Sequence, residues 1–215
     1  MWSLVVIVVL SYLTGSLPTS IVLSRVLRGI DIRDYGSGNA GGTNTVRILG
    51  WKIGAAVIVV DIGKGVLAAL LISQIRIDPV IVSPDLLRIS AGSAAIVGHI
   101  WTVFARFKGG KGVATGAGML FSLYPEAGLV CLIIFTLVLF FVRIVSVSSM
   151  AVAVSLPVVL FIQKTCLGDP VSNELLYFAI LAAVLILFTH RSNIKRLLKG
   201  EESRFKRTGF NKSKG

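Results

Sequence analysis

Long runs of apolar residues, separated by short polar segments, dominate the chain. A helix that crosses the hydrocarbon core of a bilayer needs about 20 mostly apolar residues. Seven runs approach that length, at residues 2–23, 53–72, 86–104, 113–124, 127–142, 148–162 and 175–189. The run at 113–124 is short, and Gly110 and Lys111 would have to extend it. The pattern predicts an all-α, polytopic integral membrane protein with seven transmembrane helices.

The composition agrees with a membrane protein and excludes several other classes. Of the 215 residues, 54% are hydrophobic and 15% are charged, and the mean hydropathy is +0.85. Soluble domains carry about 25% charged residues. The two cysteines, Cys131 and Cys166, are too few and too far apart for a disulfide framework or a metal cluster. A soluble enzyme, a secreted scaffold and a zinc protein are therefore excluded, and we expect no cofactor and no metal.

The charged residues predict the orientation in the membrane. The formal net charge is +12, and with seven helices eighteen of the 22 Lys and Arg fall on one side of the membrane. Because cytoplasmic loops carry an excess of Lys and Arg, we expect the N-terminus outside and the C-terminus in the cytoplasm. Residues 1–202 would form one transmembrane domain, and residues 203–215 a basic cytoplasmic tail that contacts anionic lipid. The tail lacks the aromatic platform that nucleic-acid binding would require.

Three unusual polar segments, at residues 31–47, 98–115 and 190–202, all fall on the predicted cytoplasmic side, which favours a single site there. The first two are rich in glycine, so their backbone N–H groups can turn toward a ligand and form an anion-binding concavity. They also carry hydroxyl, amide and cationic donors suited to phosphate. The candidate phosphate-binding residues are Gly36, Ser37, Gly38, Asn39, Gly41, Gly42, Thr43, Asn44 and Arg47, then Lys108, Gly109, Gly110, Lys111 and Gly112.

Two known nucleotide-binding patterns fit these segments poorly. Residues 36–41 match G-x-G-x-x-G, but a membrane helix precedes them where a dinucleotide site needs a strand. The P-loop pattern fails in both segments, because Gly42 stands where lysine is needed and Val113 follows Lys111-Gly112. Nucleotide hydrolysis therefore has no support.

The ionisable residues leave two questions open. His99 is either a polar group hydrogen-bonded at a helix end or part of the site, whereas His190, close to Asn193 in the basic cluster, favours a site role. Two histidines without clustered carboxylates or thiolates make a poor metal site. Asp61 and Lys64 share one face of the second predicted helix. They form either a structural pair that supports the loops or a direct contact with substrate.

Four motifs occur in an order that resembles a known family. They are Gly15-Ser-Leu-Pro18, the loop at 36–47, the segment at 98–115 and His190-Arg-x-Asn-Ile. Together they resemble the bacterial acyl-phosphate-dependent glycerol-3-phosphate acyltransferases, the PlsY family, over nearly the whole chain to about Glu202. The chain departs from the family pattern at Thr102, where we would expect proline more often.

The resemblance implies transfer of a fatty acyl group from acyl phosphate to the 1-hydroxyl of glycerol 3-phosphate in the bacterial inner membrane. Lysophosphatidate and inorganic phosphate would be the products, in the first step of phospholipid synthesis, without an acyl-enzyme. It implies catalytic roles for Ser37, Arg47, Lys111, His190 and Asn193. The glycine segments, with Asn39, Thr43, Asn44, His99 and Lys108, would bind the substrates.

Three other functions remain open at this point. A transporter of a small phosphorylated metabolite would use the cationic loops with Asp61 and Lys64, but the chain has no internal repeat and its polar clusters open to one side. An acyltransferase that uses acyl-CoA differs only in the donor, which the resemblance alone decides. A non-catalytic protein that binds anionic lipid would leave the glycine-rich loops unexplained. Beyond the two substrates and membrane lipids we expect no nucleic acid and no obligate protein partner.

Overall fold

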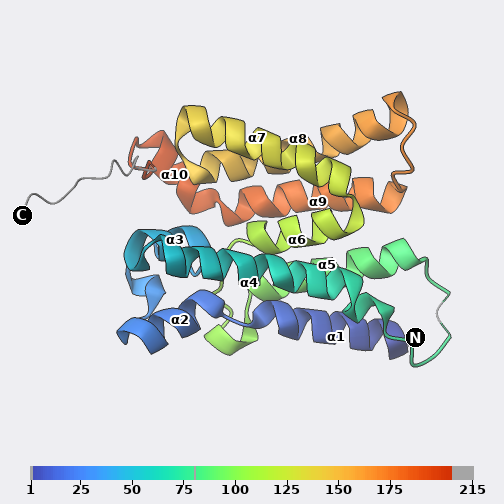
Figure 1. Cartoon of the computed structure of the whole chain (residues 1–215), viewed down its shortest axis with the longest axis horizontal. Helices are drawn as coiled ribbons and strands as arrows, with labels where there is room; N and C mark the ends of the chain where they lie inside the picture. Colours follow the sequence, from blue (N-terminus) through green and yellow to red (C-terminus); the bar gives the residue numbers. More distant parts are fainter. Residues whose placement is uncertain (1, 80, 205–215) are drawn as a thin grey trace, which may run out of the picture.

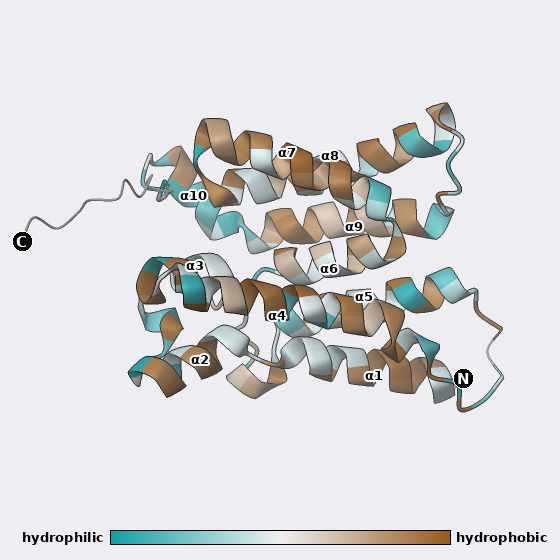
Figure 2. Cartoon of the chain, in the orientation of Figure 1, coloured by the Kyte–Doolittle hydropathy of each residue, from teal (hydrophilic) through white to brown (hydrophobic). Residues whose placement is uncertain are grey.

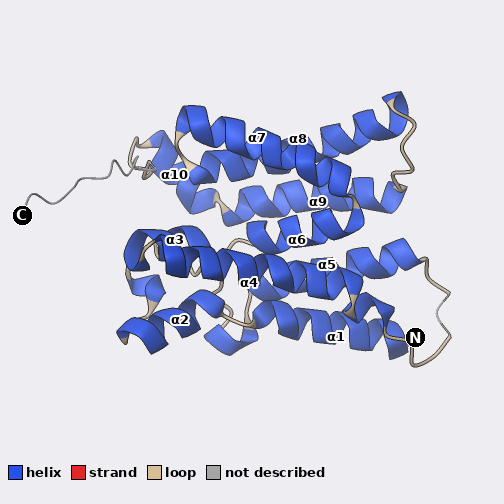
Figure 3. Ribbon diagram, viewed as in Figure 1, coloured by secondary structure: helices blue, strands red, loops and turns tan. Residues whose placement is uncertain are grey.

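The computed structural model describes residues 2–79 and 81–204, so most of the predicted basic tail lies outside the described residues. All regular secondary structure in the described part is helical, as predicted (Figure 3). The α-helices are α1 (Trp2–Ser16), α2 (Thr19–Arg28), α3 (Gly42–Leu49), α4 (Trp51–Leu70), α5 (Pro84–Ile100), α6 (Val113–Leu123), α7 (Pro125–Val142), α8 (Val145–Cys166), α9 (Asn173–Thr189) and α10 (Arg191–Leu198). Three short 3-10 helices, η1 (Ile32–Asp34), η2 (Ile72–Gln74) and η3 (Val103–Ala105), lie in the connections.

The long helices run side by side in two groups (Figure 1). Helices α1, α4 and α5 pack together in one group, and α7, α8 and α9 pack in the other. Helix α6 lies between the groups and contacts α4, α5 and α7. The short helices α2, α3 and α10 gather at one end of the bundle. The predicted polar segments therefore meet at that end.

Hydrophobic residues predominate along the long helices, and hydrophilic residues are concentrated toward the two ends of the bundle (Figure 2). Large apolar side chains such as Phe141 and Leu181 are 76% and 69% exposed. Five segments are long and apolar enough to cross a membrane, at 2–28, 51–74, 84–105, 125–142 and 145–166. A sixth exists if α9 and α10, which meet at a bend of 57°, form one span. The described chain therefore has the build of a polytopic membrane protein.

The first apolar run contains a break that the hydrophobic pattern did not predict. Helix α1 ends at Ser16, and α2 begins at Thr19 after Leu17 and Pro18. Proline has no N–H to donate, and its ring clashes with the preceding turn of a helix. At the break the carbonyl oxygen of Leu17 accepts from the N–H of Thr19 at 3.0 Å and keeps a second acceptor site for another helix, which becomes important at the site.

Glycines bring the helices into close contact. A Cβ atom at Gly15 would lie 2.0 Å from the carbonyl oxygen of Ala95 in α5, and one at Gly118 in α6 would lie 2.0 Å from that of Ile62 in α4. Small residues allow such backbone approach in membrane proteins, where dispersion contacts replace the hydrophobic effect between helices. The α1–α5 and α4–α6 pairs are therefore held at distances that only glycine permits.

Gly65→Ala should destabilise the protein, whereas Gly63→Ala on the same helix should not. A Cβ atom at Gly65 would lie 2.0 Å from the carbonyl oxygen of Thr115, whereas no described atom lies within 4 Å of one at Gly63. We expect a loss of about 1–3 kcal/mol for Gly65→Ala, since overpacking against backbone cannot be relieved by a side-chain rotation. Thermal unfolding in detergent measures both variants. Equal midpoints would mean that α4 and α6 do not pack at this distance.

Candidate active site

The first glycine segment is folded around the side chain of Asn44. Its amide nitrogen donates to the carbonyl oxygens of Ile32, Tyr35 and Asn39, at 3.1, 3.0 and 3.2 Å. Its Oδ1 accepts from the backbone N–H of Ser37 at 3.0 Å, and the residue is 1% exposed. Both amide hydrogens and one acceptor site of Oδ1 are therefore used within this segment. In this structure Asn44, predicted to contact substrate, holds the loop in shape.

The glycines of this loop meet two different requirements. Gly36 and Gly38 have φ values of 62° and 71°, in the left-handed region that glycine adopts readily. Gly42 is in the first turn of α3, where a Cβ atom would lie 2.2 Å from Cγ1 of Ile58 in α4. Gly41 precedes α3 at its N-cap, and Thr43 is half-buried in the first turn. The loop thus delivers Ser37 and the start of α3 to the end of the bundle.

The second glycine segment turns back onto the end of α5. The N–H of Gly109 donates to the carbonyl oxygen of Ile100, and the N–H of Gly110 donates to the carbonyl oxygen of His99, both at 3.0 Å. These N–H groups complete the C-terminus of α5 in this structure, and the expectation that the segment binds substrate stays a prediction. A Cβ atom at Gly110 would lie 2.1 Å from Nε2 of His99. Gly112, with a φ of 82°, is the N-cap of α6.

Lys111 lies between these loops and α10 in a network of polar side chains. Its ammonium group donates to Oδ1 of Asn193, whose amide donates to Oε1 of Glu202 at 2.6 Å. Arg196 Nε donates to Oε2 of Glu202 at 2.7 Å, and Ser146 Oγ in α8 donates to Oε1 at 2.8 Å. The structure therefore brings Lys111 and Asn193 together as expected, although they are 82 residues apart. The sequence reasoning missed Glu202, Arg196 and Ser146 as their partners.

Positive charge exceeds negative charge around Lys111. Burial lowers the pKa of Lys111 from its ordinary 10.5 to about 8, and the charges of Arg196 and Arg47 add to this, whereas Glu202 opposes it. Burial raises the pKa of Glu202, but hydrogen bonds from Asn193, Ser146 and Arg196 outweigh burial and leave it below its ordinary value. One ionised carboxylate thus faces three cationic side chains. Such a surplus suits a phosphate dianion.

His190 lies next to this network at the bend between α9 and α10. It is buried, and its Nδ1 is 2.8 Å from the carbonyl oxygen of Ile186. A carbonyl oxygen can only accept, so Nδ1 carries the hydrogen and Nε2 keeps its lone pair. The hydroxyl of the neighbouring Thr189 donates to the carbonyl oxygen of Ile186 at 2.9 Å and lies 3.4 Å from that of Lys111. His190 is therefore held beside the lysine with a fixed tautomer.

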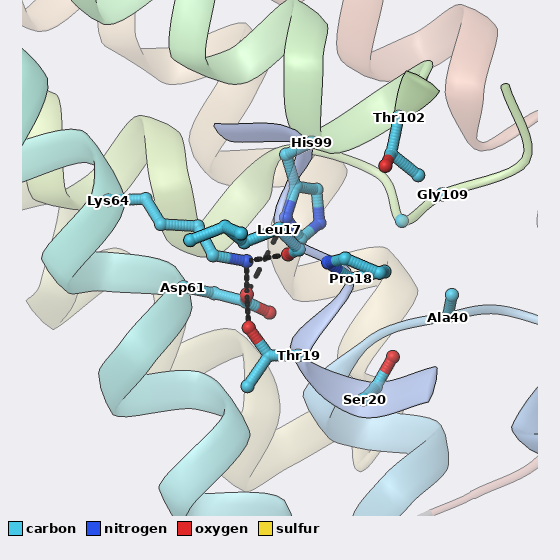
Figure 4. Close-up of a pocket in the computed structure, with 11 residues that line it drawn as sticks. Leu17, Pro18, Thr19, Ser20, Ala40, Asp61, Lys64, His99, Thr102 and Gly109 are labelled. Carbon is cyan, nitrogen blue, oxygen red and sulfur yellow. Dashed lines mark hydrogen bonds and ion pairs between the residues drawn. The ribbon is translucent and has the colours of Figure 1, made fainter. Parts of the chain in front are cut away.

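His99 belongs to a second polar cluster deeper in the bundle (Figure 4). Lys64 Nζ is 2.6 Å from Oδ1 of Asp61 and donates to the carbonyl oxygen of Leu17 at 2.6 Å. His99 Nδ1 is 3.7 Å from the same Asp61 oxygen, and the Thr19 hydroxyl donates to that oxygen at 3.4 Å. The ion pair is buried, and its lysine adds a second hydrogen bond to the carbonyl at the Pro18 break. This geometry supports the structural reading of Asp61 and Lys64.

The two clusters are distinct, and the remaining predicted residues divide between them or lie outside both. The deeper cluster borders a cavity of about 10 Å3, close to the space of one water, that Ala40, Gly109 and Gly110 also line. Lys108 is exposed, and Asn39 is half-buried beside the first loop. No three His, Cys, Asp or Glu side chains in the described part of the chain are placed to hold a metal ion.

Thr102 shows how the chain manages without proline at that position. Its φ of −67° is the value that proline would adopt. Its hydroxyl donates to the carbonyl oxygen of Ser16, the last residue of α1. The threonine therefore ties the second loop to the first helix by a bond that proline could not make.

Comparison with known proteins identifies the family. A family model described as Glycerol-3-phosphate acyltransferase matches residues 5–200. Relatives named Glycerol-3-phosphate acyltransferase from Chlorobium phaeobacteroides (strain BS1) and Chlorobium limicola are 45% and 46% identical, covering 96% and 95% of this chain and 98% and 97% of their own.

Solved structures agree with this assignment. The glycerol 3-phosphate form of PlsY (YgiH), an integral membrane glycerol 3-phosphate acyltransferase, is 35% identical with a TM-score of 0.83, covering 95% of this chain and 96% of its own. The lysophosphatidic acid form has a TM-score of 0.80 at the same identity and coverage. The resemblance seen in the four motifs is thereby confirmed, and the chain belongs to the glycerol-3-phosphate acyltransferase family of the PlsY type.

Proposed function

We propose that this protein transfers a fatty acyl group from acyl phosphate to the 1-hydroxyl of glycerol 3-phosphate, giving lysophosphatidate and inorganic phosphate. The observation that carries this proposal is the surplus of positive charge around Lys111, where Arg47 and Arg196 face one carboxylate. Family membership supports the acyltransferase activity. The glycerol 3-phosphate and lysophosphatidic acid forms of the related structures support the acceptor and the product.

The reaction requires no covalent enzyme intermediate. The acceptor's 1-hydroxyl oxygen attacks the acyl carbonyl carbon, the new ester bond forms, and the bond from that carbon to the phosphate oxygen breaks. A phosphate oxygen of the donor takes the hydroxyl proton, so inorganic phosphate leaves with that proton and the charges balance. Because acyl phosphate is already activated, positioning and charge stabilisation are enough to accelerate the step.

We assign the residues to this chemistry as follows. Arg47, Lys111 and Asn193 hold phosphate oxygens, and His190 contacts the reacting hydroxyl through its free Nε2. Ser37 and Thr43, with the backbone around Gly36, Gly38, Gly41 and Gly42, hold the second phosphate near the start of α3. Lys108, an exposed residue of the second segment, adds positive charge at the entrance. Asn39 and Gly112 shape the loops, as Asn44, Gly109 and Gly110 do.

We further propose seven crossings of the inner membrane, with α6 as a short fourth span and the site open to the cytoplasm. The start of α1 and helix α10 lie at opposite ends of the bundle (Figure 1), which supports an odd number of crossings. The basic segments gather at the end that holds α2, α3 and α10, which supports a cytoplasmic position for that end. In this arrangement the water-soluble acceptor approaches from the cytoplasm.

The purified protein in detergent should form lysophosphatidate from palmitoyl phosphate and glycerol 3-phosphate, with one phosphate released for each ester formed. Palmitoyl-CoA in a parallel reaction should give no product, because it supplies no acyl phosphate. Product from palmitoyl-CoA alone would keep the acyltransferase and overturn the donor. If neither donor reacted, the acyltransferase proposal would fail, and flux of glycerol 3-phosphate into liposomes would be measured instead.

Lys111→Met should lower kcat/KM by the equivalent of about 2–5 kcal/mol, the usual cost of removing one partner of a buried charge contact. The substitution keeps the length of the side chain and removes only its charge. Arg47→Ala should act in the same direction but more weakly, because Arg47 is exposed. The matched control is Lys195→Met, which removes an exposed lysine of α10. Equal activity of the Lys111 and Lys195 variants would remove Lys111 from the site.

The kcat/KM for glycerol 3-phosphate should fall as the pH rises through about 8. The pKa of Lys111 is lowered to about 8, so the lysine is charged below that pH and neutral above it. A phosphate monoester with a second pKa of about 6 is already dianionic in this range. Lys111→Arg should move the fall to higher pH, because arginine stays charged. A profile that stays flat up to about pH 9.5 would contradict the assignment.

A further inference from the structure

Arg33 joins the two glycine segments through a single guanidinium group. Its Nε and Nη2 donate to the two carboxylate oxygens of Asp31, at 2.9 and 2.7 Å. Its Nη1 donates across to the second segment, to the carbonyl oxygens of Ala105 at 3.0 Å and Lys108 at 3.4 Å. The side chains of Arg33 and Asp31 are only 22% and 15% exposed. All three nitrogens are therefore engaged in a partly desolvated bridge.

The turn that Arg33 holds has an unfavourable backbone conformation. Arg106 and Phe107 have φ values of 56° and 58°, in a region that residues other than glycine rarely adopt. Such residues cost about 1–3 kcal/mol each and persist where the surroundings fix them. The two carbonyl groups that Arg33 binds, those of Ala105 and Lys108, flank this pair. Backbone bonds from Lys108 to Ala105 at 3.2 Å and from Phe107 to Thr102 at 2.8 Å also close this turn, and the guanidinium ties both of its ends to the first segment.

Each glycine segment is fixed internally without Arg33. Asn44 organises the first, and the bonds from Gly109 and Gly110 to the end of α5 organise the second. An apolar cluster that includes Ile32 and Ala105 also joins the segments, but apolar contacts have no direction and permit sliding. The planar guanidinium fork does have direction.

We infer that Arg33 is a positioning residue, which sets the distance and orientation of the turn at 105–108 relative to the first glycine loop. The inference deepens the proposed function and rests on it, because the two segments flank the site where the phosphates of donor and acceptor meet. Loss of Arg33 should leave the first loop intact, loosen the turn at 105–108 and so misalign the two substrates. We therefore expect a lower kcat with a nearly unchanged KM for each substrate.

The test compares Arg33→Lys with Arg25→Lys. Arg25 contacts the same carboxylate of Asp31 at 2.8 Å but is 61% exposed and has no bond to the second segment among the described residues. Arg33→Lys should lower kcat about 10- to 100-fold, as misplacement by about 1 Å does. Each KM should stay within about threefold and the unfolding midpoint should stay near that of the unmodified protein. Arg25→Lys should match the unmodified protein in all of these.

Hydrogen exchange provides a second measurement that does not depend on turnover. Peptides covering residues 102–112 should exchange faster in Arg33→Lys than in Arg25→Lys, while those covering 36–44 should not change. An undiminished kcat, an equal loss in both variants, or unchanged exchange at 102–112 would overturn the inference. If the unmodified protein formed no product from acyl phosphate, the proposed function would fail, and hydrogen exchange alone would decide the role of Arg33.

Discussion

The bilayer supplies no hydrogen bonds, and this constraint governs the rest of the structure. Every backbone N–H and C=O in the hydrocarbon region must be paired within the protein, so the chain crosses as helices and places its irregular segments at the ends. The interruption of the first apolar run at Leu17 and Pro18 follows the same logic. The carbonyl oxygen of Leu17 accepts from the N–H of Thr19 and also from Lys64, whose charge Asp61 balances. The buried ion pair thus adds a side-chain bond to the backbone at the break.

The same constraint explains why the loops at the end of the bundle depend on side chains. These segments turn too tightly to pair their own backbone groups in ladders, so Asn44, Arg33 and Thr102 accept or donate in their place. Arg33 and Thr102 bond to backbone atoms of segments remote in sequence, and Asn44 bonds to backbone atoms of the loop that folds around it. Glycine contributes by leaving room: Gly110 accommodates the ring of His99, and Gly42 lets α3 approach α4. The result is a rigid pair of loops on a bundle of closely packed helices.

Features that depend on local sequence could be predicted, whereas contacts that depend on how the helices pack could not. Apolar runs predict helices because their length is set by the bilayer, and all seven runs contain a helix. The pairing of Lys111 with Asn193 agreed with the motif-based grouping. The sequence could not show that Asn44, Gly109 and Gly110 bond within their own segments, because an amide or an N–H in a glycine-rich loop serves its own backbone or a ligand equally well. Glu202 and Ser146 were missed, because only the fold brings the start of α8 to Glu202, which follows α10.

Keeping Lys111 charged in a buried, cationic environment costs free energy, and the electrostatics of the site give a reason for that cost. Burial and two neighbouring cations disfavour the charged form of Lys111, and one carboxylate compensates only in part. A phosphate dianion in that position would supply the missing negative charge and restore the preference for the protonated lysine. Folding stability is thus exchanged for affinity toward an anion, which is a common feature of active sites. In the proposed reaction the anion that compensates the charge is also the reacting group, so the same contact can stabilise charge that shifts as the phosphate leaves.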